Sequence, residues 1–335
     1  MLSPHRPGWI AATLLAAVLA GACAKPERVS GKSLRIAVVP QGSTYDFWKS
    51  IHAGAVKASR DLAAAGAPVD VIWKGPMRED DREQQIQVVE GFITQRVDGI
   101  VLAPFDRNAL ARPVDESASA GIPVVIIDTG VESTAPVSLV ASDNHHGGEL
   151  AADELARLLH EKGKVILLRF QQGVASTEAR EQGFEDRMRA AHPGVEIVSS
   201  NQHAGATRDT AKTAAENLLN RYGDAVDGIF TPNESSTVGA LLALEDAGRA
   251  GKIRFIGFDT SPDFVPAMRA GKMDGIIVQN PFAMGELGVK TMVRHLKGEK
   301  VEKRIDTGVT LITPSNLNAP QSKQLLAPPL DEYLK

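Results

Sequence analysis

Two aspartates that end apolar runs are the residues of this chain best suited to bind a polar small molecule. Asp128 closes the run PVVIIDT, and Asp259 closes the similar run RFIGFDT. Each carboxylate can accept hydrogen bonds from two neighbouring hydroxyls, and such charge-assisted bonds are stronger than neutral ones. The alternative is that each Asp only caps the turn after its strand. Ligands of open α/β sheets bind beyond the carboxyl ends of the strands, so both residues are candidate ligand-binding residues.

Three more polar side chains stand at comparable positions. Arg180 lies at the start of a predicted helix after the small-residue loop GVAST, while Asn233 ends GIFTPN and Gln279 ends GIIVQN. A guanidinium can bind hydroxyls and balance carboxylates, and a side-chain amide offers both donors and acceptors. A surface ion pair for Arg180 and bonds to loop backbone for the two amides are the alternatives.

Aromatic residues follow the first apolar run, in the segment PQGSTYDFW. Phe47 and Trp48 offer flat faces with a large contact area and little side-chain entropy, which suits the C–H face of a sugar ring. The alternative is that both only hold the helix on the sheet. Tyr45 and Asp46 are further candidates, although Asp46 is equally suited to cap that helix.

The elements that must position these residues alternate along the chain. Buried strands are predicted at LRIAVVP, VDVIW, GIVLAP, PVVIIDT, VSLVASDN, KVILLRF, VEIVSS, GIFTPN, RFIGFDT and GIIVQN. Helices are predicted between them, at 46–65, 80–95, 147–160, 179–191, 207–221 and 236–247. Sustained alternation of strand and helix predicts an α/β fold of parallel sheets covered on both faces.

An internal repeat predicts that this architecture occurs twice. The tetrapeptide VDGI occurs at 97–100 and again at 226–229, and each copy is followed by a loop, a helix, an Ala-Gly turn and a strand that ends in Asp-Thr. The shared order of elements indicates duplication of one module. The sequence therefore predicts two similar doubly wound lobes, with Asp128 and Asp259 facing a cleft between them.

Composition excludes several other classes of protein. With 37 Lys+Arg against 41 Asp+Glu the formal net charge is −4, which offers no basic footprint for nucleic acid. The single Cys cannot build a thiolate zinc site, and no phosphate-binding or nucleophile motif occurs. We therefore expect no metal and no cofactor. Paired aspartates could still serve acid–base chemistry, as in glycoside hydrolysis, which keeps an enzyme open as an alternative.

The N-terminus has the layout of an export signal. A short positive region is followed by an apolar stretch and then by Ala20, Gly21 and Ala22, directly before Cys23. The position of this Cys resembles a bacterial lipoprotein box, with Ala20 where Leu is usual. We expect residues 1–22 to be a signal peptide, Cys23 to be lipidated, and residues 23–33 to form a linker to the membrane.

The motifs of the body resemble those of the bacterial periplasmic sugar-binding proteins of the ribose-binding type, which have the type 1 periplasmic binding protein fold. The resemblance runs from Leu34 to near Ile312 and is strongest in VDGIVLAPFD, AGIPVVIIDT, SDNHHGG, AREQGF, FTPNES, IGFDTSPD and IIVQNP. It implies that Phe47 and Trp48 sandwich a sugar. It also implies that the pocket is completed by Asp128, Arg180, Asn233, Asp259 and Gln279.

Four positions depart from the ribose-type pattern. Thr129 replaces an Arg, Tyr45 replaces a pocket Asn, and Gln41 replaces a small Ser. The pocket aromatic of the second lobe falls near Ala206, so that face of the sugar is expected to be open. We therefore expect a small sugar or polyol without assigning ribose.

The same resemblance implies that the chain crosses between the lobes three times, near 142–144, 279–280 and 306–307. The N-terminal lobe would comprise residues 34–142 and 280–306. The C-terminal lobe would comprise residues 143–279 and 307–335, including a tail longer than in ribose-type proteins.

The implied function is that of a monomeric, lipid-anchored solute-binding protein of the cell envelope, periplasmic or extracytoplasmic, which delivers its ligand to the permease of an ABC importer. A sensor that presents the ligand to a chemoreceptor or histidine kinase is the alternative, and the glycoside-processing enzyme is a third. Transcription regulators of the lactose-repressor family share the fold. Here the export signal occupies the place of their DNA-binding segment.

Overall fold

A computed structural model describes Met1 and residues 33–335 of the chain. The predicted signal peptide after Met1, Cys23 and all but the last residue of the predicted linker lie outside the described residues. No helix in the described part of the chain is long and apolar enough to cross a membrane.

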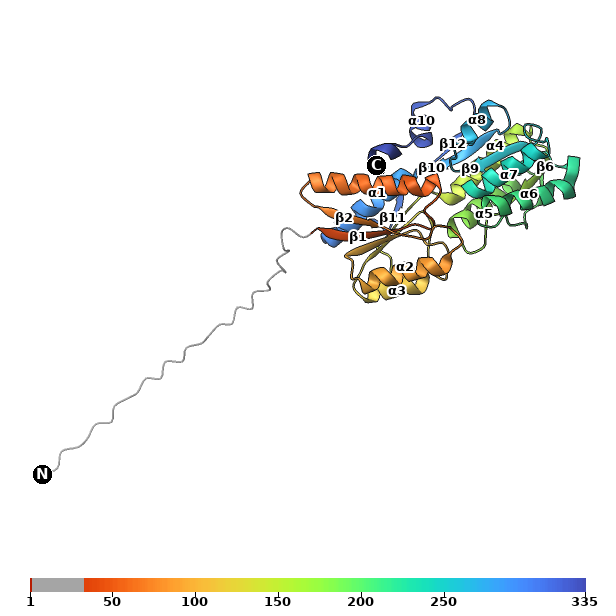
Figure 1. The fold of residues 1–335 in the computed structure, drawn as a ribbon. Helices are drawn as coiled ribbons and strands as arrows, with labels where there is room; N and C mark the ends of the chain where they lie inside the picture. The colour runs from red at the N-terminus through yellow and green to blue at the C-terminus, as the bar shows by residue number, and fades with distance from the viewer. Residues whose placement is uncertain (2–32) are drawn as a thin grey trace. The chain divides into compact units, whose positions relative to one another are not determined.

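The first sheet contains six parallel strands in the order β11-β5-β4-β3-β1-β2. The strands are β1 (Leu34–Val39), β2 (Val69–Trp73), β3 (Gly99–Leu102), β4 (Val124–Ile127), β5 (Ser138–Ala141) and β11 (Arg304–Asp306). Helices α1 (Asp46–Ala64) and α9 (Pro281–Leu296) cover one face. Helices α2 (Arg82–Thr94) and α3 (Ala111–Ser119) cover the other (Figure 1).

The second sheet has the order β12-β10-β9-β8-β6-β7, and only β12 is antiparallel to its neighbour. Its strands are β6 (Gly163–Leu167), β7 (Val195–Ser199), β8 (Gly228–Phe230), β9 (Arg254–Phe258), β10 (Gly275–Gln279) and β12 (Val309–Ile312). Helices α4 (Asn144–Leu158) and α5 (Ala175–Ala191) cover one face. The other face carries α6 (Arg208–Tyr222) with the 3₁₀ turn Gly223–Ala225, α7 (Glu234–Asp246) and α8 (Phe264–Arg269).

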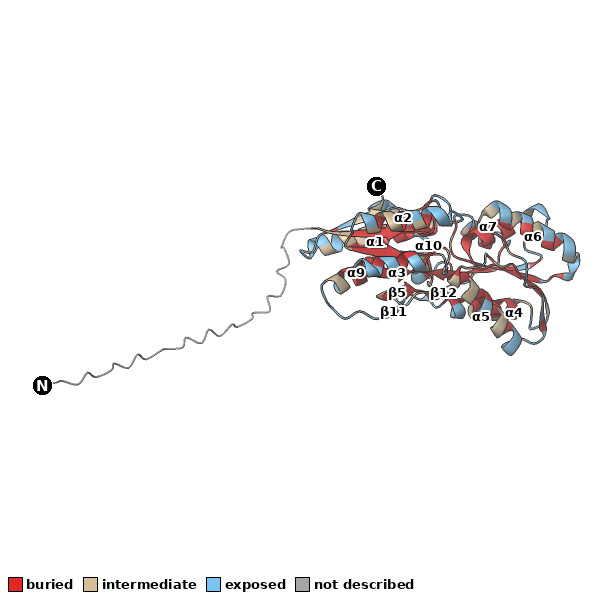
Figure 2. Ribbon diagram, turned by 90° about the horizontal axis from the view of Figure 1, so that it is seen from below, coloured by how far each residue is buried: buried red, intermediate tan, exposed pale blue. Residues whose placement is uncertain are grey.

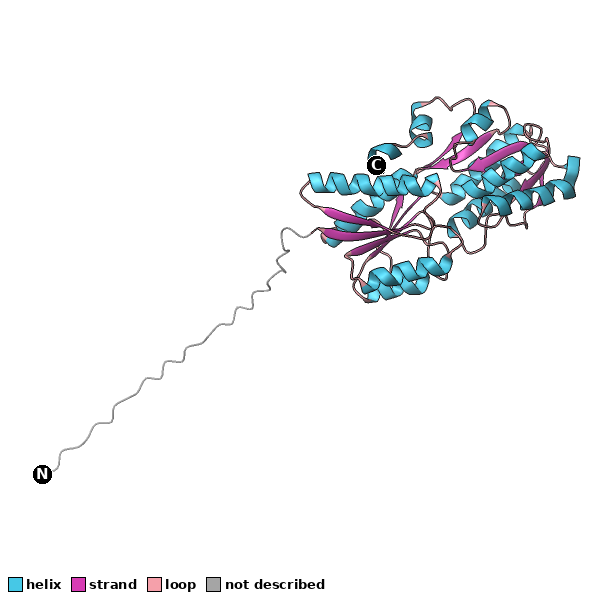
Figure 3. Ribbon diagram, in the orientation of Figure 1, coloured by secondary structure: helices cyan, strands magenta, loops and turns pink. Residues whose placement is uncertain are grey.

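Both sheets are therefore covered on two faces, and the predicted α/β class with two doubly wound lobes is confirmed. In Figure 3 the strands lie between layers of helices, and in Figure 2 the strands are buried while the outer helix surfaces are exposed. The sequence missed β11 and β12, because neither segment is a continuous apolar run: Arg304 and Asp306 are exposed, and most of β12 is only half-buried.

The chain passes between the two sheets three times. It leaves the first sheet after β5, returns after β10 through α9 and β11, and leaves again at Thr307 and Gly308 to form β12. Ser142 joins two of these passes, because its hydroxyl donates to Gly308 O at 2.7 Å. The interleaved connections bring the carboxyl ends of both sets of parallel strands to one cleft.

The repeat predicted from VDGI is confirmed in atomic detail. Asp98 accepts from the backbone N–H of Arg35 at 2.7 Å, and Asp227 accepts from that of Lys164 at 2.8 Å. Asp98 directly precedes β3 and bonds to the start of β1, which pairs with β3. Asp227 directly precedes β8 and bonds to the start of β6, which pairs with β8. The two copies of the module therefore contain equivalent Asp-to-backbone hydrogen bonds as well as the same order of elements.

The C-terminal tail contacts both lobes. Helix α10 (Pro320–Leu326) ends with Leu325 and Leu326 packed on the second core. Helix α11 (Leu330–Tyr333) instead packs against α1 of the first lobe. There Arg60 donates to Glu332 O at 2.9 Å, and the Tyr333 ring lies 5.7 Å from that of Phe282. The apolar residues LLAPPL fit either surface, so the sequence could not assign them.

Each lobe contains a helix pair in which glycines of both helices bring the two backbones into close contact. In α1 and α9, a Cβ on Gly54 would collide with Phe282 O, and one on Gly285 would collide with Ile51 O. In α4 and α5, Gly148 and Gly183 approach the carbonyl oxygens of Arg180 and His145 in the same reciprocal way. These carbonyls belong to helix backbone, so any side chain larger than hydrogen would push the helices apart.

We predict that Gly54→Ala and Gly285→Ala each lower the free energy of unfolding by about 1–3 kcal/mol, the usual cost of overpacking. Urea denaturation followed by circular dichroism measures this. The matched control is Gly91→Ala in α2, where an added Cβ meets nothing within 4 Å. That variant should gain about 0.5–1 kcal/mol from helix propensity. Equal behaviour of the three variants would contradict the packing argument.

Candidate functional site

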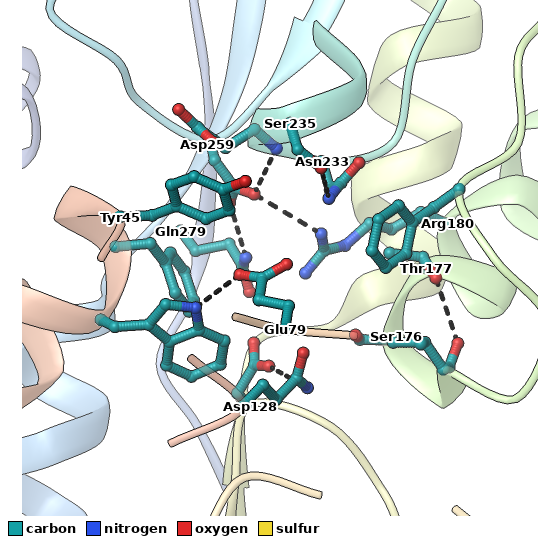
Figure 4. Close-up of a pocket in the computed structure, with 16 residues that line it drawn as sticks. Tyr45, Glu79, Asp128, Ser176, Thr177, Arg180, Asn233, Ser235, Asp259 and Gln279 are labelled. Atoms are coloured by element: carbon teal, nitrogen blue, oxygen red, sulfur yellow. Dashed lines mark hydrogen bonds and ion pairs between the residues drawn. The ribbon is translucent and has the colours of Figure 1, made fainter. Parts of the chain in front are cut away.

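The candidate site is a pocket between the two lobes (Figure 4). All eight residues predicted to bind ligand line this pocket: Tyr45, Phe47, Trp48, Asp128, Arg180, Asn233, Asp259 and Gln279. Eight further residues line it with them: Gln41, Glu79, Phe170, Val174, Ser176, Thr177, Glu234 and Ser235. Residues far apart in sequence therefore meet because parallel strands of both sheets end here.

Helix α1 presents the aromatic wall. Tyr45 is its N-cap residue, and Phe47 and Trp48 follow in the first turn. The two rings meet edge to face with centroids 4.9 Å apart, and both are buried. Trp48 Nε1 donates a hydrogen bond to Glu79 Oε1 at 2.5 Å, which fixes the indole relative to the loop after β2. Asp46 instead forms an exposed ion pair with Lys49.

The two predicted aspartates occupy equivalent places in the two lobes. Asp128 follows β4 and Asp259 follows β9, with φ of 65° and 66°. A left-handed backbone is uncommon outside Gly, Asn and Asp, and here it turns both side chains into the pocket (Figure 4). Asp128 Oδ2 accepts from Gln41 Nε2 at 3.5 Å. Asp259 accepts from Gln279 Nε2 at 2.7 Å and from Glu234 N at 3.2 Å.

Arg180 is the buried cation of the pocket, with 2% of its surface exposed. Its Nε donates to Asn144 Oδ1 and its Nη1 to Pro232 O, both at 2.8 Å. The same Nη1 lies 3.9 Å from Asp259 Oδ2, and the guanidinium stacks over the Phe258 ring. Burial lowers the pKa of Arg180, and the charges of Asp259 and Asp128 counter that effect. This is not the surface ion pair that the sequence left open.

The side-chain amides of Asn233 and Gln279 bond to neighbouring protein groups as well as lining the pocket. Asn233 is the N-cap of α7, where its Oδ1 accepts from Ser236 N, and its Nδ2 donates to Ser235 Oγ at 3.0 Å. Gln279 donates to Asp259, but its Oε1 is buried without a hydrogen-bond partner. Gln279 therefore has an acceptor available in the pocket, whereas Asn233 is largely used by its own helix.

The aromatic expected to be missing near Ala206 is supplied by another residue. Phe170, which follows β6, lines the pocket and packs in one cluster with Ala206, Val174 and Phe105. The expectation of an open face there was therefore wrong. The small side chain of Ala206 leaves room for the Phe170 ring. In the sequence, Phe170 was predicted only as the end of a strand.

Two acidic residues were also missed. Glu234 directly follows Asn233 and could have been suspected from that position. Glu79 lies in the loop MREDD, where nothing in the sequence separates it from the neighbouring Asp80 and Asp81. Both line the pocket. In the described part of the chain, no group of three or more His, Cys, Asp or Glu side chains is arranged to hold a metal ion.

Burial perturbs the acids of the pocket. Loss of solvation raises the pKa of Glu79 to about 8, and the charges of Glu234, Asp128 and Asp259 add to this, against the hydrogen bond from Trp48. Burial likewise raises the pKa of Asp128 to about 7, against the attraction of Arg180. The pKa of Glu234 rises to about 7 for the same reason, with Arg208 opposing.

Direct contacts hold the lobes together around the pocket. Ser176 N donates to Thr129 Oγ1 at 3.0 Å, and Arg107 N donates to Gly173 O at 3.0 Å. The Arg107 guanidinium forms an ion pair with Glu178 at 3.0 Å. These bonds join loops of the first lobe to the start of α5 and the loop before it. The described arrangement is consequently a closed one.

We predict that the closed arrangement described here loses stability as pH rises from 7 to 9. A carboxyl whose pKa is higher in the folded than in the unfolded state binds more protons when folded, so its ionisation favours unfolding. Glu79, with a pKa of about 8, should dominate this range. Thermal denaturation between pH 7 and 9 should show a decline in Tm that is clearly smaller in Glu79→Gln than in the wild type.

The exposed Glu302→Gln is the control, and its Tm should decline as the wild-type Tm does. Equal slopes in all three proteins would contradict the assignment.

Comparison with known proteins agrees with this geometry. Residues 36–300 match the family model described as periplasmic binding protein domain. The ribose import binding protein RbsB of Haemophilus influenzae is 31% identical over 302 residues, covering 90% of this chain and 98% of the relative. The D-ribose/D-allose-binding protein of Pseudomonas aeruginosa is 28% identical, covering 90% of this chain and 97% of its own length.

A solved structure shows the same fold. The carbohydrate transporter solute binding protein of Agrobacterium radiobacter, determined in complex with D-arabinose, has a TM-score of 0.84 and 31% identity, covering 89% of this chain and 100% of that chain. The family model spans most of the sequence, and both lobes and the cleft are present. The chain therefore belongs to the periplasmic binding protein family.

Proposed function

We propose that this protein captures a sugar or sugar-like molecule in the interlobe pocket and delivers it to an ABC importer. The observation that carries the proposal is the pocket's composition. The aromatic rings of α1 and Phe170 line the pocket together with the strand-end carboxylates Asp128 and Asp259 and the buried Arg180. Aromatic faces suit the apolar side of a sugar ring, and charged groups suit its hydroxyls.

The relatives support a ligand of this class. Their names and complexes identify ribose, allose and arabinose as ligands of those proteins. Members of this family are substrate-binding components of transport and not enzymes. We therefore set aside the glycoside-processing alternative and assign the pocket acids to binding.

We further propose how binding is communicated. The lobes, residues 34–142 with 280–306 and residues 143–279 with 307–335, close over the ligand by bending at the three crossings. Closure forms the contact of Thr129 with Ser176 at the start of α5. It also forms the contacts of Arg107 with Gly173, in the loop before α5, and with Glu178 of α5. The face made by the joined lobes is what the permease recognises. Because α11 also contacts α1, the tail must adjust when the lobes separate.

Family membership implies a location outside the cytoplasmic membrane, periplasmic or extracytoplasmic. We propose that lipidated Cys23 anchors the protein there, after removal of residues 1–22, and that it acts as a monomer. Mass spectrometry of the membrane fraction should show diacylglyceryl Cys23 at the mature N-terminus. Recovery of a soluble, unlipidated chain from wild-type cells would contradict the anchor.

The proposed pocket predicts which substitutions abolish ligand binding. Pentoses, hexoses and polyols, including ribose, allose and arabinose, should be screened by thermal shift, and the best ligand measured by calorimetry. Asp128→Asn and Asp259→Asn should each weaken binding by roughly 10- to 100-fold, because each removes charge-assisted hydrogen bonds of about 1.5–3 kcal/mol. Asn tolerates the left-handed backbone of these positions, so the fold is preserved.

The control for this experiment is Asp70→Ala, at an exposed position on β2. It should bind as wild type does. Trp48 fluorescence in a Trp73→Phe background offers a second readout, because the Trp48 indole lines the pocket. Wild-type affinity in both Asn variants would show that the ligand binds elsewhere.

A further inference from the structure

The pocket contains more negative than positive charge. Four carboxylates line it: Glu79, Asp128, Glu234 and Asp259. Two of them have a cationic partner, since Asp259 lies 3.9 Å from Arg180 and Glu234 pairs with Arg208. Within residues 33–335, no Lys, Arg or His lies within ion-pair distance of the other two, Glu79 and Asp128. Asp128 is buried and Glu79 is half-buried, and taking an unpaired charge out of water is costly.

The hydrogen bonds that these two acids receive do not replace a cation. Glu79 accepts from the neutral Trp48 indole, and Asp128 accepts one long bond from the Gln41 amide. Thr129, beside Asp128, is also neutral, and its hydroxyl is engaged by the backbone N–H of Ser176. The hydrogen bonds to Glu79 and Asp128 therefore come from uncharged donors only, and Arg180 attracts Asp128 from beyond ion-pair distance.

Buried acceptors without partners provide a second, independent observation. Gln279, 2% exposed, has its Oε1 unpaired, and Glu234, 5% exposed, has its Oε2 unpaired. Both residues line the pocket. Unsatisfied buried acceptors are rare because each costs free energy. Together with the unpaired carboxylates, they require a ligand rich in donors.

We propose that the ligand is a polyhydroxylated molecule that carries a protonated amine, such as an amino sugar or amino polyol, with its ammonium group between Glu79 and Asp128. This inference rests on the proposed function and specifies its ligand class. An ammonium group has three donors and no acceptor, and it supplies the positive charge that the two carboxylates lack. Arg180 and the aromatic wall remain available for the hydroxyls and the ring.

A neutral sugar satisfies this pocket less well. Its hydroxyls can donate to the carboxylates, but each also brings lone pairs, and it places no positive charge against either acid when the lobes exclude water. Loss of solvation raises the pKa of Glu79 and of Asp128, and the charge of Arg180 opposes this only at Asp128. A bound ammonium would favour the ionised form of both acids.

The test compares ligands that differ only at one group. Three sets are measured by calorimetry on the processed chain: glucosamine, glucose and N-acetylglucosamine; galactosamine, galactose and N-acetylgalactosamine; and 1-amino-1-deoxysorbitol with sorbitol. In at least one set the free amine should bind at least tenfold more tightly than its hydroxyl counterpart. A hydrogen bond between charged partners contributes the free energy that a tenfold change requires. The N-acetyl compound, which keeps the nitrogen without the charge, should lose this advantage.

Variants of Glu79 and Asp128 test whether these two residues cause the preference for the amine. Glu79→Gln keeps an oxygen acceptor for the Trp48 indole but removes the charge, so the ratio of amine to hydroxyl affinity should fall about tenfold. Asp128→Asn is the second variant and should lower the ratio in the same way. The exposed Glu302→Gln should leave the ratio at its wild-type value.

The outcomes separate this inference from the proposed function. If neutral sugars bind at the pocket and every amine binds equally or more weakly, the function stands and the amine inference fails. An amine preference that survives both Glu79→Gln and Asp128→Asn also overturns it. If no sugar, polyol or amine binds, both the function and the inference are contradicted.

Discussion

Burial of acidic groups in the cleft is the constraint on which the rest of this structure depends. Asp128 and Asp259 reach the cleft only because parallel strands of two sheets end there, with both residues in a left-handed backbone conformation. Taking them out of water raises their pKa and must be offset by partners. Arg180 is the principal partner supplied by the protein. The rest of the cost of burying these carboxylates must be offset by donors on the ligand, so the charges of the pocket determine which class of ligand binds.

Most of the fold could be predicted from the sequence, because fully buried parallel strands are continuous apolar runs. PVVIIDT and RFIGFDT also showed that one module occurs twice. The short strands β11 and β12 carry no such pattern. They are held by pairing with β5 and β10, which only the assembled sheets provide. The position of α11 on α1 depends in the same way on a tertiary surface.

The candidate site could be predicted where a residue ends a strand or begins a helix. Asp128, Asp259 and Gln279 satisfy that rule. Arg180 was predicted at a helix start but lies in the second turn of α5, which begins at Ala175. The structure brings all four together. Glu79 does not satisfy it, since it lies in an acidic loop where nothing in the sequence distinguishes it from Asp80 and Asp81. Phe170 was hidden for a different reason, because an aromatic at the end of an apolar run resembles core. These two residues change the interpretation of the pocket more than those that were foreseen.

A crystal structure of the processed chain with its best ligand tests the central claim most directly. The account predicts that the ligand lies between the lobes, its ring against Trp48 and Phe47, with polar groups bonded to Asp128, Asp259 and Arg180. Density for the ligand on an outer surface, or in the cleft without contact to either aspartate, would contradict it.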